Sequence, residues 1–173
     1  MTRIVAAFAL MLCALAPAAA QTPTTLTLDT TQGRVVIKLR ADIAPKHAER
    51  LATLANKGFY NNVVFHRVID GFMAQTGDPT GTGRGGSKYP DLKQEFSAEP
   101  HVRGTASMAR AQSPDSANSQ FFICFADARF LDRQYTVWGK VIEGMENVDQ
   151  IKRGEPVRDP DKMTSVKVAA DLA

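Results

Sequence analysis

The chain has 173 residues, of which 44% are hydrophobic and 23% charged, so it has the composition of a soluble globular protein and not of a disordered, collagen-like or coiled-coil chain. Its net charge of +3 is too small and scattered to indicate a nucleic-acid partner. Its two cysteines, Cys13 and Cys124, exclude a disulfide-rich scaffold and a multi-cysteine zinc site. The length predicts a single domain.

The first twenty residues have the pattern of a secretory signal peptide. Arg3 precedes an uncharged apolar run at residues 4–15, and a proline and a stretch of alanines follow it. We expect cleavage after Ala20, a mature domain of residues 21–173, and a periplasmic location. A membrane-spanning helix is the alternative, but the apolar run is shorter than the about 20 residues that a bilayer requires.

Cys13 raises a second alternative, a lipid anchor. The bulky Leu12 directly before it disfavours this, because lipoprotein cleavage sites resemble a small residue followed by cysteine. Cleavage after Ala20 would leave Cys124 alone in the mature chain, so no internal disulfide is expected. No later segment is apolar over a length that could span a membrane.

The mature chain alternates short strand patterns with turn signals. The clearest helix is predicted over residues 45–57, because Pro45 suits a first turn, an apolar face recurs at helical spacing, and Gly58 ends it. The apolar face consists of Ala48, Leu51, Leu54 and Ala55. A shorter helix is expected near residues 145–151. Strands are expected at residues 25–28, 34–39, 63–69, 72–76, 105–109, 120–124, 136–141 and 165–170. The first two form a hairpin around the turn residues 31–33, and the whole pattern indicates an all-β barrel or sandwich.

Residues 81–86 satisfy the letters of a dinucleotide-binding glycine motif. Such a site also needs a helix that begins in the loop and receives the pyrophosphate. The following Ser87-Lys88-Tyr89-Pro90 is a poor helix start, and the Gly-Lys-Ser/Thr order of a phosphate loop is absent. We therefore expect no nucleotide site here.

Metal and nucleophile chemistry have little support. The three histidines, His47, His66 and His101, are far apart and lack metal-site spacing. Cys124 lies within the apolar run of residues 121–125, which favours a buried strand thiol over a nucleophile. No cofactor and no metal are expected.

The most informative segment is residues 65–78, Phe-His-Arg-Val-Ile-Asp-Gly-Phe-Met-Ala-Gln-Thr-Gly-Asp. Alternate side chains of a strand share a face, so Arg67 lies on the face opposite His66, and Met73 and Gln75 lie together. On spacing alone, an arginine at a barrel rim with a structural His66 explains this segment as well as a functional site does.

This segment resembles the signature of the cyclophilins, which are peptidyl-prolyl cis–trans isomerases. Two further blocks are similar to that family in the same order: Ser-Met-Ala at residues 107–109 with Asn-Ser-Gln-Phe-Phe-Ile at 118–123, and Phe-Leu-Asp at 130–132 with Val-Trp-Gly-Lys-Val at 137–141. The resemblance covers nearly the whole mature chain. It implies a closed eight-stranded antiparallel β-barrel capped by two α-helices, with the site on the outer face of the barrel.

The resemblance also implies the residue roles. Arg67 matches the catalytic arginine, with Phe72 and Gln75 beside it in the catalytic set. Phe72, Met73, Phe122 and Leu131 match the pocket for the proline ring. The groove around it is matched by Gln75, Ala109, Arg110, Ala111 and Gln120, and further substrate contacts are implied for His66, Phe130 and Tyr135.

Three positions depart from the family pattern. Phe130 stands where tryptophan is common in eukaryotic members, so the indole N–H donor is lost while aromatic contact remains. The resemblance implies that cyclosporin, the inhibitor of the family, uses that donor. Cyclosporin is therefore expected to bind this chain more weakly. Tyr135 stands in place of histidine, which changes the rim of the groove and supplies another hydrogen-bonding aromatic ring. Arg110 stands in place of asparagine, and a shift in the preference for residues flanking proline is expected from it.

Rotation about an X–Pro bond needs no nucleophile, metal or redox cofactor, because no bond to hydrogen or oxygen is broken. We therefore predict an exported isomerase that acts on proline-containing polypeptide segments and assists their folding, with Arg67 stabilising the twisted amide. A proline-peptide binding module or holdase with little catalysis is the alternative; hydrolysis is disfavoured because no nucleophile constellation is present. Nothing in the sequence requires assembly, so a monomer is expected.

Overall fold

The computed structural model describes residues 23–169, so the expected signal peptide and its cleavage site lie outside the described residues. Within this range the chain forms nine strands, two α-helices and one turn of 3₁₀ helix. The strands are β1 (Thr25–Thr30), β2 (Gly33–Leu39), β3 (Val63–Val64), β4 (Arg67–Ile69), β5 (Met73–Thr76), β6 (Thr105–Met108), β7 (Phe121–Cys124), β8 (Val137–Glu143) and β9 (Lys162–Ala169). The helices are α1 (Pro45–Asn56), η1 (Arg129–Leu131) and α2 (Met145–Asp149).

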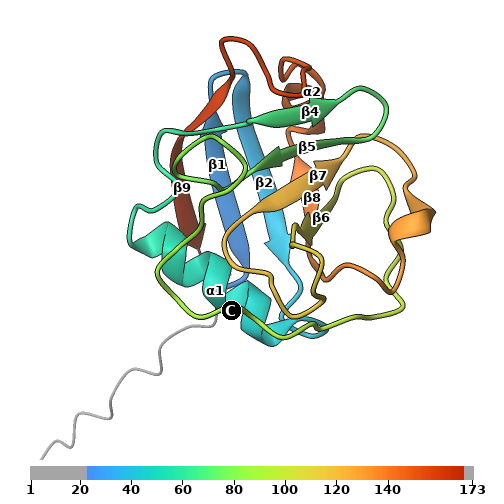
Figure 1. Cartoon of the computed structure of the whole chain (residues 1–173). Coiled ribbons are helices and arrows are strands. Elements are labelled where there is room, and N and C mark those ends of the chain that lie inside the picture. The colour runs from blue at the N-terminus through green and yellow to red at the C-terminus, as the bar shows by residue number, and fades with distance from the viewer. Residues whose placement is uncertain (1–22, 170–173) are drawn as a thin grey trace, which may run out of the picture.

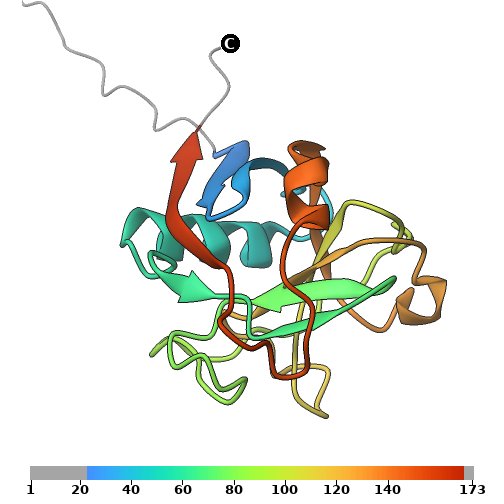
Figure 2. The ribbon, with the colours of Figure 1, turned by 90° about the horizontal axis from the view of Figure 1, so that it is seen from above.

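All nine strands belong to one antiparallel sheet in the order β3-β9-β1-β2-β8-β6-β7-β5-β4. The two strands at the ends of this order, β3 and β4, are consecutive in the chain and are separated only by Phe65 and His66. The sheet therefore curls back toward its own beginning and forms a half-barrel (Figures 1 and 2).

The expected mainly β class is confirmed, but the closed eight-stranded barrel needs correction. The predicted strand at residues 63–69 is two strands, because the chain changes partner within it. Val63 and Val64 pair with β9, whereas Arg67 to Ile69 pair with β5. Between them the N–H of Phe65 donates to the carbonyl of Asp161. This change of partner raises the strand count to nine, and no ladder joins β3 to β4 within residues 23–169.

The predicted helices are confirmed, each with a slightly earlier end. In α1 the four expected apolar positions are all buried, and Pro45 occupies the first turn. The backbone N–H groups of Lys46 and His47 donate to the Glu95 carboxylate at 3.1 and 3.0 Å, which satisfies the exposed helix start. The two helices lie at opposite ends of the curled sheet (Figure 1). No helix within residues 23–169 has the length and apolar character needed to cross a membrane.

The two faces of the sheet carry different apolar clusters. The inner face holds the main core, in which Phe121 packs edge-on against Trp138 and Tyr60. The outer face holds a smaller cluster of Met73, Phe122, Cys124, Ala128 and Leu131. Because neighbouring residues of a strand point to opposite faces, the run of aromatic and aliphatic residues in β7 supplies both clusters at once.

Truncation of phenylalanine to alanine should destabilise the protein by different amounts on the two faces of the sheet. Phe121 is 1% exposed in the core and Phe130 is 66% exposed on the outer face. We expect Phe121→Ala to lower the free energy of unfolding by about 3–5 kcal/mol, since it opens a cavity, and Phe130→Ala to lower it by less than about 1 kcal/mol. Urea denaturation of both variants measures this difference, and equal losses would contradict the assignment of the core.

Candidate active site

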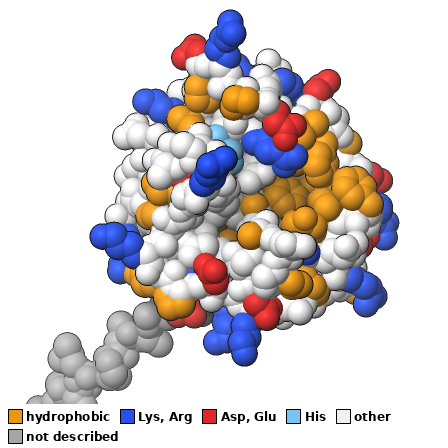
Figure 3. Space-filling view, viewed as in Figure 1, with side chains coloured by type: hydrophobic (Ala, Val, Ile, Leu, Met, Phe, Trp, Pro, Cys, Tyr) orange, Lys and Arg blue, Asp and Glu red, His pale blue; other side chains and the backbone are white. Residues whose placement is uncertain are grey.

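A hollow of about 680 Å³ lies on the outer face of the sheet. Figure 3 shows it as a patch of hydrophobic side chains with basic, acidic and histidine side chains along its upper edge. It is lined by predicted site residues from several elements and by four residues that were not predicted. The predicted ones are His66, Arg67, Phe72, Met73, Gln75, Ala109, Arg110, Phe122, Phe130, Leu131 and Tyr135, and the others are Thr82, Gly83, Glu155 and Pro156.

The floor of the hollow is apolar and rigidly backed. Met73, Phe122 and Leu131 are buried to at least 92%, so each presents only a small face to solvent. Tyr135 meets Phe122 edge-on, with ring centroids 6.0 Å apart. Phe72 packs against the exposed ring of Phe130 at 5.5 Å. The result is a slot with aromatic walls of the kind that a small apolar ring can enter.

Strand register places Arg67 at the edge of this slot. Arg67 of β4 lies opposite Gln75 of β5, and Gln75 lies opposite Phe122 of β7. Arg67 Nη1 donates to Gln75 Oε1 at 3.3 Å, and Gln75 Nε2 donates to Gln120 Oε1 at 3.0 Å. Gln120 Nε2 in turn donates to two carbonyls of the glycine-rich loop, at 3.1 and 2.8 Å. A chain of amide groups therefore orients the guanidinium.

A second hollow of about 570 Å³ extends the first. The two share Gln75, Gly83, Ala109 and Arg110 in their walls, so together they form one elongated groove. Two further predicted residues, Ala111 and Gln120, line this second part. The structure thus gathers all thirteen predicted site residues around one groove, while the roles assigned to them stay predictions.

The Arg110 side chain folds back onto the wall of the groove. Its guanidinium lies 4.5 Å from the centre of the Tyr135 ring and donates to the backbone carbonyls of Ala111, Gln112 and Gln134. These contacts use its donors within the protein. The Arg110 guanidinium is therefore held against the wall of the groove by the Tyr135 ring and the Gln134 carbonyl.

His66 lines the same hollow as Arg67, so the expectation that the two lie on opposite faces is wrong; His66 precedes β4, and strand alternation does not extend to it. It is 7% exposed, and neither ring nitrogen has a hydrogen-bond partner among the described residues. Gly83 covers the ring, and a Cβ on Gly83 would lie 3.4 Å from His66 Cδ2. Burial lowers the pKa of His66, and the nearby Asp78 opposes this only in part. The ring is therefore neutral at pH 7.

The glycine-rich loop is organised around Asp78 and begins no helix, as expected. The buried Asp78 carboxylate accepts hydrogen bonds from the N–H groups of Thr80, Thr82 and Gly83, at 2.8, 3.1 and 2.6 Å. Burial alone would raise the pKa of Asp78. The Thr80 hydroxyl and the N–H groups of Thr80, Gly85 and Gly83 outweigh burial and lower the pKa to about 2. One buried carboxylate therefore holds the loop against Gln120 and His66.

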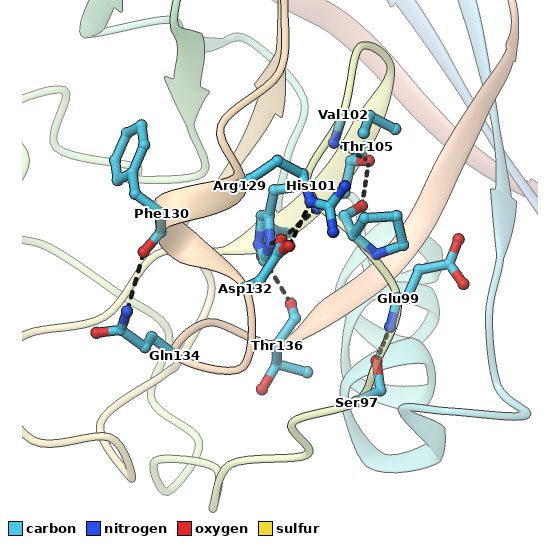
Figure 4. Close-up of polar contacts among 12 residues, drawn as sticks. Ser97, Glu99, His101, Val102, Thr105, Arg129, Phe130, Asp132, Gln134 and Thr136 are labelled. Carbon is cyan, nitrogen blue, oxygen red and sulfur yellow. Dashed lines mark hydrogen bonds and ion pairs between the residues drawn. The ribbon is translucent and has the colours of Figure 1, made fainter.

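A buried polar network supports the slot from below. His101 Nδ1 lies 3.1 Å from Asp132 Oδ1, and His101 Nε2 lies 2.9 Å from Ser107 Oγ. Figure 4 shows the Asp132 carboxylate between the His101 ring and the Arg129 guanidinium. The His101 ring stacks on Phe122 with centroids 6.2 Å apart. The network thus ties the floor of the slot to η1, which carries Phe130 and Leu131.

This Ser–His–Asp arrangement resembles a hydrolase triad in its contacts but not in its access. Ser107 and His101 are fully buried beneath the slot, so no substrate carbonyl can approach the hydroxyl. Cys124 is equally inaccessible, and burial raises the pKa of its thiol to about 12. Among residues 23–169, no group of three or more His, Cys, Asp or Glu side chains is placed to hold a metal ion.

Sequence reasoning missed Glu155 and the His101 network. Glu155 Oε1 accepts from Arg67 Nε at 2.5 Å, although 88 residues separate the two in the chain. His101 and Asp132 are 31 residues apart. No local periodicity or motif connects such pairs, because only the tertiary fold brings them together.

The curled antiparallel sheet and its outer groove define a cyclophilin-like protein, and comparison with known proteins agrees. The model of the family described as cyclophilin type peptidyl-prolyl cis-trans isomerase/CLD matches residues 25–170. The chain therefore belongs to this family and to the corresponding enzyme class. A curated relative from Brucella suis, named probable peptidyl-prolyl cis-trans isomerase, is 50% identical over 169 residues, covering 88% of this chain and 86% of that protein.

Solved structures agree with this assignment. A cyclophilin from Hirschia baltica superposes with a TM-score of 0.79 at 30% identity, over 87% of this chain and 75% of that one. A cyclophilin-type isomerase from Cryptosporidium parvum, crystallised in the presence of the dipeptide Ala-Pro, gives a TM-score of 0.78 at 29% identity. That match covers 85% of this chain and 99% of the other. The expected family and enzyme class are confirmed.

Because the pKa of Asp78 is lowered, we predict that its contribution to stability is lost in acid. Its pKa is about 2 in the fold against an ordinary value of 3.8, so its contribution is present above about pH 4 and is lost as the pH falls toward about 2. We expect Asp78→Asn to be less stable than the wild type at pH 7, with a difference that shrinks through this window. Urea denaturation over a pH series measures it, and a difference that stays constant down to pH 2 would contradict the prediction.

Proposed function

We propose that the outer groove binds an X–Pro segment with its proline ring in the apolar slot, and that Arg67 stabilises the twisted amide during rotation. The observation that carries this proposal is the position of Arg67, which lines the same hollow as the slot. Within the described residues its Nε and Nη1 have partners, whereas Nη2 has none. The Ala-Pro dipeptide present with the Cryptosporidium parvum relative supports a proline-containing ligand.

Rotation about an X–Pro bond requires the protein only to bind the segment and to place a hydrogen-bond donor near the prolyl nitrogen. Amide resonance gives the X–Pro bond a rotation barrier of about 18–20 kcal/mol. Twisting breaks the resonance and returns a lone pair to the prolyl nitrogen, which becomes a better hydrogen-bond acceptor. A guanidinium N–H near this nitrogen therefore binds the twisted state more tightly than either planar state, which is the condition for catalysis.

Magnitudes show what Arg67 can and cannot supply. A hydrogen bond to a charged group contributes roughly 1.5–3 kcal/mol, and each 1.36 kcal/mol changes a rate about tenfold. Arg67 alone therefore accounts for about one to two powers of ten. The rest of the acceleration comes from holding the ring in the slot, orienting the amide and excluding water from it.

The substitution Arg67→Ala tests this assignment. We expect it to lower kcat/KM for a proline peptide by about 10- to 100-fold, with the fold intact because the Arg67 side chain is 39% exposed. Cis–trans exchange measured by NMR gives the rates, and circular dichroism checks the fold. Arg34→Ala is the matched control, since Arg34 is an exposed arginine of β2, paired with Asp29.

Two results would count against the proposal. Unchanged exchange with Arg67→Ala would remove Arg67 from the mechanism. Binding of the peptide without any acceleration by the wild type would mark the chain as a proline-peptide binding module or holdase.

We further propose that the enzyme acts in the periplasm on chains that fold after export. Slow isomerisation of X–Pro bonds can limit folding, so a compartment that receives unfolded chains benefits from an isomerase. Within the same proposal the enzyme works as a monomer, and cyclosporin binds it more weakly than it binds members with tryptophan in place of Phe130.

Export predicts a specific mature N-terminus. Expression of the full chain in a Gram-negative host should yield a periplasmic protein that begins at Gln21. Fractionation followed by N-terminal sequencing measures both the location and the start. An uncleaved chain that keeps its signal peptide and stays in the cytoplasmic fraction would contradict the export proposal.

A further inference from the structure

We propose that Glu155 is a positioning residue that fixes the Arg67 guanidinium for catalysis. The inference rests on the proposed role of Arg67 and adds a residue that neither the sequence motifs nor the family comparisons assign. It is drawn from one contact, in which Glu155 Oε1 accepts from Arg67 Nε at 2.5 Å, and from the way the fold places Glu155 there.

The guanidinium of Arg67 is held on two of its edges. Glu155 binds Nε on one edge, and Gln75 Oε1 accepts from Nη1 at 3.3 Å on another. A guanidinium is planar, so two partners at different nitrogens fix both its position and its plane. Nη2 keeps its donors free of any partner within residues 23–169, and Arg67 and Glu155 line the same hollow. The two contacts thus leave donors for a substrate.

The backbone on both sides of Glu155 is fastened to the strand that carries Arg67. Gly154 exchanges two hydrogen bonds of 2.8 Å with Val68, the residue after Arg67. The N–H of Val157 donates to the carbonyl of His66, the residue before Arg67, at 3.2 Å. Three backbone hydrogen bonds to His66 and Val68, the neighbours of Arg67, therefore hold the loop so that Glu155 lies beside Arg67.

Gly154 makes this close approach possible. Its φ is +153°, and a Cβ there would lie 2.8 Å from both the Pro156 carbonyl oxygen and Val157 Cα. Only a residue without a side chain fits inside the turn that Gly154 forms with Pro156 and Val157, and this turn keeps Gly154 paired with Val68 of β4. The path of the loop toward Arg67 is thus built into the backbone.

The exposure of the pair indicates what its role is. The side chains of Arg67 and Glu155 are 39% and 57% exposed, and ion pairs of this kind add little to stability because water screens them. Orientation of Arg67 is then the larger consequence of the contact. If Glu155 instead blocked the Arg67 guanidinium from the substrate, its removal would make the enzyme faster.

Kinetics of three variants separate these roles. Glu155→Ala should lower kcat about two- to fivefold with little change in KM. Glu155→Gln should lose less, because its amide oxygen can still accept from Nε. Asp159→Asn is the matched control, since Asp159 lies in the same loop and its exposed carboxylate pairs with Lys152 and not with Arg67. This variant should have the wild-type kcat and KM. All variants should unfold at the wild-type urea concentration within error.

A double-mutant cycle with Arg67→Ala distinguishes positioning from a general effect on the loop. If Glu155 acts through Arg67, Glu155→Ala should cause no further loss in the Arg67→Ala background. A loss of the same size in both backgrounds, a rate equal to the wild type, or a faster rate for Glu155→Ala would each overturn the inference. The proposed function fails by different results: a wild-type rate for Arg67→Ala, or peptide binding by the wild type without acceleration of exchange.

Discussion

The register of four neighbouring strands is the constraint on which the site depends. Arg67 of β4 lies opposite Gln75 of β5, Gln75 opposite Phe122 of β7, and Phe122 opposite Ser107 of β6. This row runs across the outer face of the sheet and carries, in order, the cation, its orienting amide, the floor of the slot and the support beneath it. A slip of one residue in any strand would turn its member of the row into the core.

The same strands therefore carry two unlike sets of residues. Their inward residues, such as Phe121 and Ile123, belong to the main core and stabilise the fold. Their outward residues build a shallow apolar cluster that ends at solvent, and burial there is completed by η1. Asp132 ties η1 to His101 beneath Phe122, so the wall and the floor of the slot are held by one buried network. Stability and function are thus separated by the alternation of side chains along each strand.

Much of this could be predicted from local sequence. The helix from Pro45 and the hairpin between β1 and β2 follow from turn residues and from spacing, and both are confirmed. The resemblance of three blocks placed the predicted site residues, which the fold then gathered around one groove. The break of a predicted strand at Phe65 and His66 could not be foreseen, because it depends on two different pairing partners. Glu155 was missed for the same reason: its partner is brought to it only by the tertiary pairing of Gly154 with Val68 of β4.

The central claim is that a guanidinium N–H faces the prolyl nitrogen while the proline ring occupies the apolar slot. A crystal structure of the protein with a bound peptide containing Ala-Pro tests this most directly. The account predicts the ring against Phe122, Met73 and Leu131, with an Arg67 Nη atom on the side of the prolyl nitrogen. A ring bound elsewhere in the groove, or an Arg67 side chain turned away from the bound amide, would contradict it.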